Sequence, residues 1–388
     1  MPDFDPVALA ARFPWFLLLS AVMIAVGSTV IFLPIARRFG WVDKPSTRKS
    51  HEGEVPLIGG WGVLLALALL QAFGSAESRA PWGYWLGAVL LFAVAVIDDR
   101  HPIRARYRLA VQLTAALAGV LLGGELLSDV GDLLGTGDLS AWWIVAPVSV
   151  LGTVGVINAV NFTDGADGLC GGLGFISMFW FLIAVAIATS LAGASGEVPK
   201  AYAGSLIPLA AAMMGGLVGF LYFNLRSPWR KKAMIFLGDG GSMLIGFTLA
   251  WFAIHVTTAF GKSSVSPVVC LWIMAVPLAD SISCMVRRIL SGAKPMTPDL
   301  KHLHHLARRA GLSVSESVVV IHAGSFLCGL VGVTGWWLGV PERWMFALFV
   351  LALMTFVFLT NLAWRESDRT ASSSRAISAS GLGDYSNP

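Results

Sequence analysis

Residues 169–192, LCGGLGFISMFWFLIAVAIATSLA, decide the fold class, because they contain no charged residue and are long enough to cross a bilayer as a helix. They follow directly on a polar segment, NAVNFTDGADG (158–168), which carries two aspartates and two asparagines but no lysine or arginine. The same alternation of long apolar runs and short polar breaks continues in both directions. We therefore expect an all-α, polytopic integral membrane protein.

The composition supports this class. Of the 388 residues, 56% are hydrophobic and only 13% are charged, and the mean hydropathy is +0.73, whereas about a quarter of the residues of soluble domains are charged. This excludes a soluble globular enzyme, a coiled coil and a disordered protein. We find eleven apolar runs, each expected to be one membrane-spanning helix: 14–35, 57–74, 82–97, 109–124, 142–157, 169–192, 201–222, 241–260, 266–286, 317–339 and 343–363.

The basic residues assign the two sides of the membrane. One set of loops, with the tail after residue 363, carries 22 of the 27 lysines and arginines, and this bias marks the cytoplasmic side. The N-terminus is then outside and the C-terminus is cytoplasmic. We expect one catalytic transmembrane domain over residues 1–363 and a disordered cytoplasmic tail over 364–388. The cytoplasmic loops that would form its site are 36–56, 98–108, 158–168, 223–240 and 287–316. The net charge of +4 does not indicate a nucleic-acid partner.

The third apolar run ends in two adjacent carboxylates, Asp98 and Asp99. Such a pair at a membrane edge repels itself unless a cation or hydrogen bonds hold it. A divalent metal would explain the pair. The alternative is that the acids are solvated and balanced by the nearby arginines, which include Arg106 and Arg108.

The polar segment 158–168 is the most specific signal. Its side chains Asn158, Asn161, Asp164 and Asp167 have no basic neighbour in the segment, so they need a metal ion, a distant base or a hydrogen-bonding ligand. Their hard oxygen atoms suit Mg²⁺ and do not suit zinc. The alternative is a glycine-rich loop built on Asx turns.

Two further segments lie at the ends of later runs. Asp239, in FLGDGGS (236–242), could complete a metal site or cap the helix that begins there. The segment PDLKHLHH (298–305) contains three histidines without a cysteine or HExxH partner, so we favour a diphosphate- or sugar-binding loop over a zinc site. Asp280 lies inside the ninth run and should be paired within the bundle, with a partner that the sequence does not identify.

The first cytoplasmic loop contains a basic segment, DKPSTRKSH (43–51), followed by the pair Gly59-Gly60. Several cations and a glycine pair next to a helix start suit phosphate binding. The alternative is an ordinary loop whose charges only set the topology. If the five polar segments meet at one face of the membrane, the pattern favours Mg²⁺-dependent chemistry on a phosphate-bearing substrate.

Taken in order, these motifs resemble the polyprenyl-phosphate N-acetylhexosamine-1-phosphate transferase family over residues 41–306, and most closely its bacterial undecaprenyl-phosphate GlcNAc-1-phosphate branch. The resemblance implies transfer of an N-acetylhexosamine 1-phosphate from a UDP-sugar, with UDP-GlcNAc favoured, to undecaprenyl phosphate, with release of UMP. It also implies Mg²⁺, or Mn²⁺ in its place, and a site at the cytoplasmic face of the bacterial inner membrane. The step would open a cell-surface glycan pathway, and the sequence also allows a homodimer in the lipid bilayer.

The resemblance assigns roles to the matched residues. Asp98, Asp99, Asp239 and the three histidines His302, His304 and His305 would be catalytic. Asp239, Asn161 and Asp98 would hold the metal. The remaining matched residues would bind substrate: Arg48, Lys49, His51, Asn158, Asp164, Asp167, Phe236, Arg106 and Arg108. Phe236 would stack on the uracil ring and Asp167 would accept from its imide N–H.

Two alternatives remain open. A translocase I-type phospho-N-acetylmuramoyl-pentapeptide transferase shares the reaction class, but its typical Thr-Pro-Thr-Met-Gly-Gly segment and triple histidine are replaced here by VPLIGG (55–60) and HLHH (302–305). A transporter of nucleotide or phosphorylated sugars would also need cations, but it should place its polar residues near the bilayer midplane.

Overall fold

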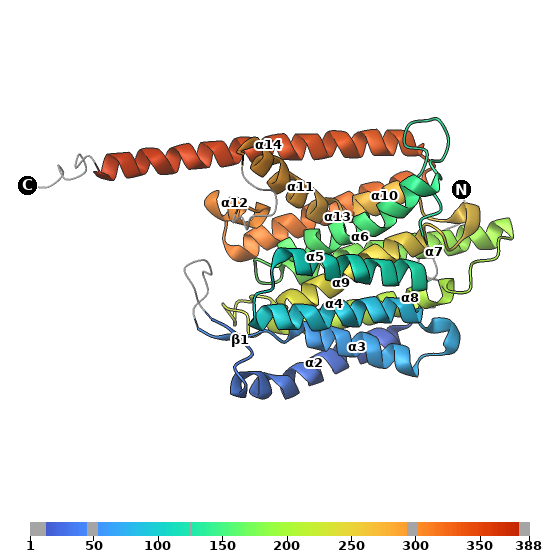
Figure 1. Cartoon of the computed structure of the whole chain (residues 1–388), viewed down its shortest axis with the longest axis horizontal. Helices are drawn as coiled ribbons and strands as arrows, with labels where there is room; N and C mark the ends of the chain where they lie inside the picture. Colours follow the sequence, from blue (N-terminus) through green and yellow to red (C-terminus); the bar gives the residue numbers. More distant parts are fainter. Residues whose placement is uncertain (1–12, 45–52, 124–125, 293–300, 380–388) are drawn as a thin grey trace, which may run out of the picture.

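The computed structural model describes residues 13–44, 53–123, 126–292 and 301–379, and long helices make up nearly all of its regular structure (Figure 1). The strands are a short antiparallel pair, β1 (Val42–Asp43) with β2 (Val55–Pro56). The helices are α2 (Trp15–Arg38), α3 (Gly59–Phe73), α4 (Trp82–Arg100), α5 (Ala105–Leu117), α6 (Trp142–Phe162), α7 (Leu169–Ser195), α8 (Ala203–Asn224), α9 (Gly238–Val256), α10 (Pro267–Ile273), α11 (Ala275–Leu290), α12 (Leu303–Arg309), α13 (Val314–Trp337) and α14 (Glu342–Ala379). Three short turns complete them: η1 (Ala76–Ser78), η2 (Ala118–Leu122) and η3 (Gly261–Ser263).

Each of the eleven predicted apolar runs is occupied by a helix. Within the described ranges, eight helices are long and apolar enough to cross a membrane. The segment Gly261–Ile273 and α11 meet at a bend of 49°, and they would form a ninth span if together they make one crossing. Helix α3 is shorter, and α5 continues into the π turn η2. The chain is therefore an all-α polytopic membrane protein.

Helix α9 forms the centre of the bundle, where nearly all of its residues are buried. It packs against α3, α4, α6 and α7. Glycines allow these backbones to approach closely: a Cβ on Gly60 would lie 2.6 Å from the Cα of Gly241, and one on Gly246 would lie 2.7 Å from the Cα of Ile157. Such contacts are typical of helices in lipid, where burial of apolar surface gives little driving force and close packing replaces it.

The rim of the bundle has the opposite character. Helix α2 packs only against α3, α8 and β2 among the major contacts of the described chain, and its Phe16, Met23 and Ile31 are more than half exposed. Large apolar side chains that face outward along a whole helix are suited to lipid and not to water.

The polar loops gather at one end of the bundle. Figure 1 shows that α2 and α6 end there, that α9 begins there beside β1, and that α12 lies there as well. Helix α14 passes the same end and continues beyond it to Ala379. The prediction of a disordered tail from residue 364 is therefore wrong up to residue 379. In the part of α14 whose side chains are described, Asp368 pairs with Arg309 of α12 at 3.0 Å.

Candidate active site

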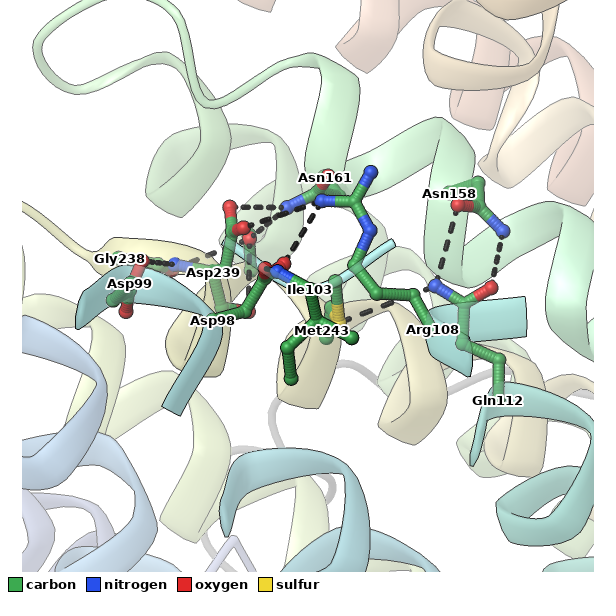
Figure 2. A network of polar contacts seen from close by, with 11 residues as sticks. Asp98, Asp99, Ile103, Arg108, Gln112, Asn158, Asn161, Gly238, Asp239 and Met243 are labelled. Carbon is green, nitrogen blue, oxygen red and sulfur yellow. Dashed lines mark hydrogen bonds and ion pairs between the residues drawn. The ribbon is translucent and has the colours of Figure 1, made fainter. Parts of the chain in front are cut away.

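Four helix ends bring charged and amide side chains into one cluster (Figure 2). Asp98, at the end of α4, accepts hydrogen bonds from the Nη1 of Arg108 at 2.9 Å and from the backbone N–H of Ile103 at 2.5 Å. The same Arg108 nitrogen lies 3.8 Å from the Oδ2 of Asp239, at the start of α9. Asn161, at the end of α6, donates from its Nδ2 to Asp239 at 3.0 Å. Three of the five polar segments of the sequence analysis, 98–108, 158–168 and 236–242, therefore meet here.

The start of α9 is capped by Asp99 and not by Asp239, the residue for which the sequence analysis had left capping as one alternative. The Oδ1 of Asp99 accepts the backbone N–H of Asp239 at 3.1 Å, so the helix is capped from another span. Gly238 has a φ of +75°, and a Cβ there would lie 2.8 Å from the Asp99 carboxylate. The carboxylate of Asp239 is thereby released from capping and faces Asn161 and Arg108.

This cluster carries more negative than positive charge. Asp164, in the loop between α6 and α7, is half-buried and has no cationic partner among the described residues. Burial, followed by the charges of Asp239 and Asp99, raises the pKa of Asp164 well above its ordinary value. Arg108 contributes a positive charge to the cluster through its contacts with Asp98 and Asp239. The donor set therefore favours an additional cation, and its oxygen atoms suit Mg²⁺.

Asn158 does not face the cluster. Its Nδ2 donates to the Oε1 of Gln112 at 2.8 Å and to the carbonyl of Val154 at 2.8 Å, and its Oδ1 accepts from Gln112 at 3.3 Å. Both ends of the amide are engaged, so the predicted substrate-binding role does not fit this geometry. Instead, the pair Gln112–Asn158 joins α5 to α6 and fixes the helix that carries Arg108. Nothing in the apolar pattern singled out Gln112.

The loop 163–168 is held by residues that the sequence analysis did not select. Asp167 pairs with Arg226 at 2.6 Å, so a base from a distant loop supplies the counter-charge that the loop lacks. Arg226 therefore does more than set the orientation of the membrane helices. The buried Asn224 accepts from the N–H of Gly168 at 2.6 Å and donates to the carbonyl of Ile235 at 2.8 Å. A lone polar residue at the end of an otherwise apolar run was the only signal for it.

Residues 301–305, called here the histidine segment, pack onto this loop through His304. A Cβ on Gly165 would lie 2.4 Å from the Nε2 of His304, so only glycine allows the ring to approach so closely. That Nε2 is buried and has no hydrogen-bond partner among the residues that the structure describes. Burial, and then the neighbouring His305, lowers the pKa of His304 to about 3, which keeps the imidazole neutral. His302 lies against Phe162, with ring centroids 5.5 Å apart.

The partner of Asp280 is His302. Asp280 Oδ2 lies 2.9 Å from His302 Nδ1, and Asp280 Oδ1 accepts the backbone N–H of Leu303 at 2.8 Å. The expected pairing inside the bundle is confirmed, and it ties the histidine segment to α11.

Three predicted substrate-binding residues, Arg48, Lys49 and His51, lie outside the described residues. Arg106 does not join the cluster, because it is exposed and its guanidinium lies over its own neighbour Tyr107, 4.8 Å from the ring centroid. Helical geometry explains the difference from Arg108, since residues two apart point to different faces of α5.

The glycine pair Gly59-Gly60 does not present free N–H groups to a phosphate. Gly59 N donates to the carbonyl of Phe236 at 2.9 Å and Gly60 N to that of Leu237 at 3.0 Å. The predicted phosphate-binding role is therefore wrong for these two residues. They instead fasten the start of α3 to the segment before α9, while the ring of Phe236 remains half-exposed.

A narrow apolar pocket, with a cavity volume of about 10 Å³, lies between α4, α5 and α9 and reaches Asp98 and Arg108 of the cluster. Its lining is apolar except for Asp98, Arg108 and Gln112, and it comprises Leu91, Val94, Ala95, Asp98, Arg108, Val111, Gln112 and Met243. A cation beside a row of aliphatic side chains is the environment that an amphiphile with an anionic head requires.

Comparison with known proteins agrees with this site. The model of glycosyl transferase family 4 matches residues 81–257, which include Asp98, Asn161 and Asp239. The undecaprenyl-phosphate alpha-N-acetylglucosaminyl 1-phosphate transferase of Yersinia pestis is 34% identical over 344 residues, covering 87% of this chain and 90% of that protein. The proteins of the same name from Haemophilus influenzae and Escherichia coli K12 are 33% and 32% identical, each over 87% of this chain and over 91% and 89% of their own lengths. This chain therefore belongs to glycosyl transferase family 4, within the group of undecaprenyl-phosphate N-acetylglucosaminyl 1-phosphate transferases.

Proposed function

We propose that this protein transfers N-acetylglucosamine 1-phosphate from UDP-GlcNAc to undecaprenyl phosphate, and that it thereby starts a cell-surface glycan. The observation that carries this proposal is the apolar pocket that ends at Arg108 and Asp98, directly beside the carboxylate–amide cluster. The head of a lipid phosphate would meet Arg108 beside these apolar side chains, while a water-soluble nucleotide sugar would reach the cluster from the loops. The names of the relatives supply the substrates.

The reaction forms one P–O bond and breaks another. An oxygen of the lipid phosphate attacks the sugar-linked phosphorus, and UMP leaves with the electron pair of the broken bond. Arg108 would hold the lipid phosphate at the end of the pocket, and Asp98 would keep the guanidinium in place. Asp167 and Phe236 would bind the uracil, which requires Asp167 to exchange Arg226 for the imide N–H.

A divalent metal fits this site. Asn161 donates from its Nδ2 to Asp239 and to Ser242, which leaves its amide oxygen available as a ligand. Asp239, Asn161 and Asp164 would hold Mg²⁺, or Mn²⁺, which would neutralise the charge that develops on the diphosphate. Asp98 fits less well than the sequence suggested, because both of its oxygens already accept hydrogen bonds.

The topology belongs to the same proposal. If α3 and the continuous α5–η2 segment each complete a crossing, the bundle has eleven spans, with the N-terminus outside and the C-terminus in the cytoplasm. Tryptophans at the far end support the position of a membrane interface there: Trp82, Trp142, Trp143 and Trp344 are more than half exposed near the starts of α4, α6 and α14, as an interfacial belt requires. The active-site loops would then face the cytoplasm from a single catalytic domain in the bacterial inner membrane.

The proposal is tested with purified protein, undecaprenyl phosphate, Mg²⁺ and a panel of UDP-N-acetyl sugars. We expect UMP release that depends on the lipid and is fastest with UDP-GlcNAc. Faster turnover with UDP-N-acetylmuramoyl-pentapeptide would favour the translocase I-type alternative. Folded protein that turns over no donor would refute the proposed reaction.

A further inference from the structure

A buried carboxylate, that of Asp280 on α11, contacts the histidine segment at His302 and Leu303. His302, Asp280 and Cys284 are 6%, 5% and 2% exposed, so their contacts are shielded from water. The Nδ1 of His302 lies 2.9 Å from the Oδ2 of Asp280 and 3.4 Å from the Sγ of Cys284. An imidazole that faces Asp280 with one nitrogen must turn the other, Nε2, to the opposite edge of the ring, away from α11.

The charge state of His302 follows from its surroundings. Burial alone would favour the neutral ring, but the hydrogen bonds to Asp280 and Cys284, together with the charge of Asp280, raise the pKa of His302 to about 9. Other charged or titratable groups of the described chain near this segment are Arg287 on α11, Lys301 before α12, His304 and His305 on α12, and Asp368 on α14, which pairs with Lys301. On the α6 side, the ring meets the uncharged Phe162. Asp280 is the carboxylate that contacts the imidazole.

The same three side chains could be read as a metal site, since one ligand atom from each lies within 4.8 Å of the others. The surrounding charge argues against this. The Nη2 of Arg287 lies 3.1 Å from the Sγ of Cys284, so a positive charge already occupies the side where a divalent cation would bind. The positive charges of Arg287, beside Cys284, and of protonated His302 balance the negative charge of Asp280, so no metal is needed there.

We propose that Asp280 is a positioning residue of the active site, which holds His302 protonated and in one orientation, so that its Nε2–H can donate to a phosphate oxygen of the donor. This deepens the proposed function and rests on it, because the diphosphate is the anion that Nε2–H would meet. His304, which stays neutral, would then differ in role from His302 although both lie in one short segment.

The test is the pH dependence of kcat/KM for UDP-GlcNAc in the wild type, Asp280→Asn, Asp280→Glu and Asp368→Asn. In the wild type, we expect kcat/KM to stay constant up to about pH 8 and then to fall with a midpoint near pH 9, as His302 loses its proton. In Asp280→Asn the ring loses its carboxylate, so its pKa should fall to about 6.5, the ordinary value for histidine. The variant should then be about 30-fold or more slower than the wild type at pH 8, from the change in protonated fraction, and within about twofold at pH 6.

The two other variants separate charge from structure. Asp280→Glu keeps the carboxylate and should restore much of the alkaline activity. Asp368→Asn removes the exposed carboxylate that binds Lys301 and Arg309 from the other side of the same segment, and its profile should match the wild type. An Asp280→Asn variant that is equally impaired at pH 6 and pH 8 would overturn the proposal, since that pattern indicates a structural role alone.

Other outcomes are also decisive. If Asp280→Asn does not fold, the wild-type profile remains a test, because a fall centred near pH 6.5 or a rate that rises through this range would contradict a protonated His302. One equivalent of transition metal that is retained by the wild type and lost in Cys284→Ser would overturn the proposal as well. A wild type without lipid-dependent UMP release would refute the proposed function instead, so the two failures are distinguishable.

Discussion

The carboxylate–amide cluster and the histidine segment lie at the same end of the bundle, but they have opposite charge balances. The cluster contains four carboxylates, Asp98, Asp99, Asp164 and Asp239. Arg108 forms ion pairs with Asp98 and Asp239. Around the histidine segment, Arg287, Lys301 and Arg309 surround the ring of Trp364, and Asp280 is the buried acid. One region is suited to receive a cation and the other to receive an anion.

The two regions also differ in how they are held. The cluster is assembled from the ends of α4, α5, α6 and α9, whose positions are set by packing inside the membrane part of the bundle. The histidine segment lies outside the spans and is fastened by Asp280 from within and by Asp368 from α14. A metal–diphosphate substrate would bridge the two regions, which explains why neither is electrically balanced alone.

The largest effect should come from removing charge at the centre of the cluster. Asp239→Asn keeps the size of the side chain but lowers its affinity for a cation, so we expect kcat/KM to fall about 10²- to 10³-fold. UMP release by the folded variant measures this. Asp138→Asn, an exposed acid elsewhere in the chain, is the matched control and should be unaffected. A normal rate for Asp239→Asn would remove the cluster from the chemistry.

The next effect separates Arg108 from Arg106. Arg108→Gln loses a charge-assisted contact with the lipid phosphate, and we expect KM for undecaprenyl phosphate to rise about 10- to 100-fold. Arg106→Gln should have a normal KM, because that side chain lies over Tyr107 outside the cluster. Equal effects at both positions would show that general surface charge, and not the pocket, attracts the lipid.

The metal dependence sharpens the comparison further. Chelation should stop turnover, and Mg²⁺ should restore it. Asn161→Ala should raise the Mg²⁺ concentration for half-maximal activity about 10-fold, because a ligand oxygen is lost. Ser242→Ala removes only the hydrogen bond that Asn161 donates at 2.8 Å, and it should shift this concentration much less. If the serine variant shifted it as strongly, Asn161 would act through hydrogen bonding and not as a ligand.

The smallest effect is expected at the buried amide pair. Asn158→Ala leaves Gln112 without its partner and should lower the free energy of unfolding by about 1 kcal/mol, with little change in KM. Thermal unfolding in detergent measures the loss, and the double variant Gln112→Leu with Asn158→Leu should recover part of it. A raised KM at unchanged stability would instead place Asn158 among the substrate-binding residues.

The part of the site that could be predicted shares one property. Asp98, Asn161 and Asp239 each lie where an apolar run meets a polar break, and a charged or amide group at such a boundary is costly unless it is used. Gln112 and Asn224 could not be found in this way, since each is a single amide within or at the end of a helix. The role of each depends on a hydrogen-bond partner from a distant segment of the chain. For the same reason, the glycine pair Gly59-Gly60 suggested a phosphate site, although its N–H groups are used by residues 236 and 237.

By itself the sequence determined that the chain is a bundle of membrane helices with its polar residues in the breaks, because twenty apolar residues in a row have one stable arrangement in lipid. Only the tertiary structure decided which carboxylate does what. Asp99 caps α9, Asp98 holds Arg108, and Asp280 pairs with His302 rather than with a residue nearby in the chain. These assignments depend on distances between different spans, and a local pattern of residues carries no information about such distances.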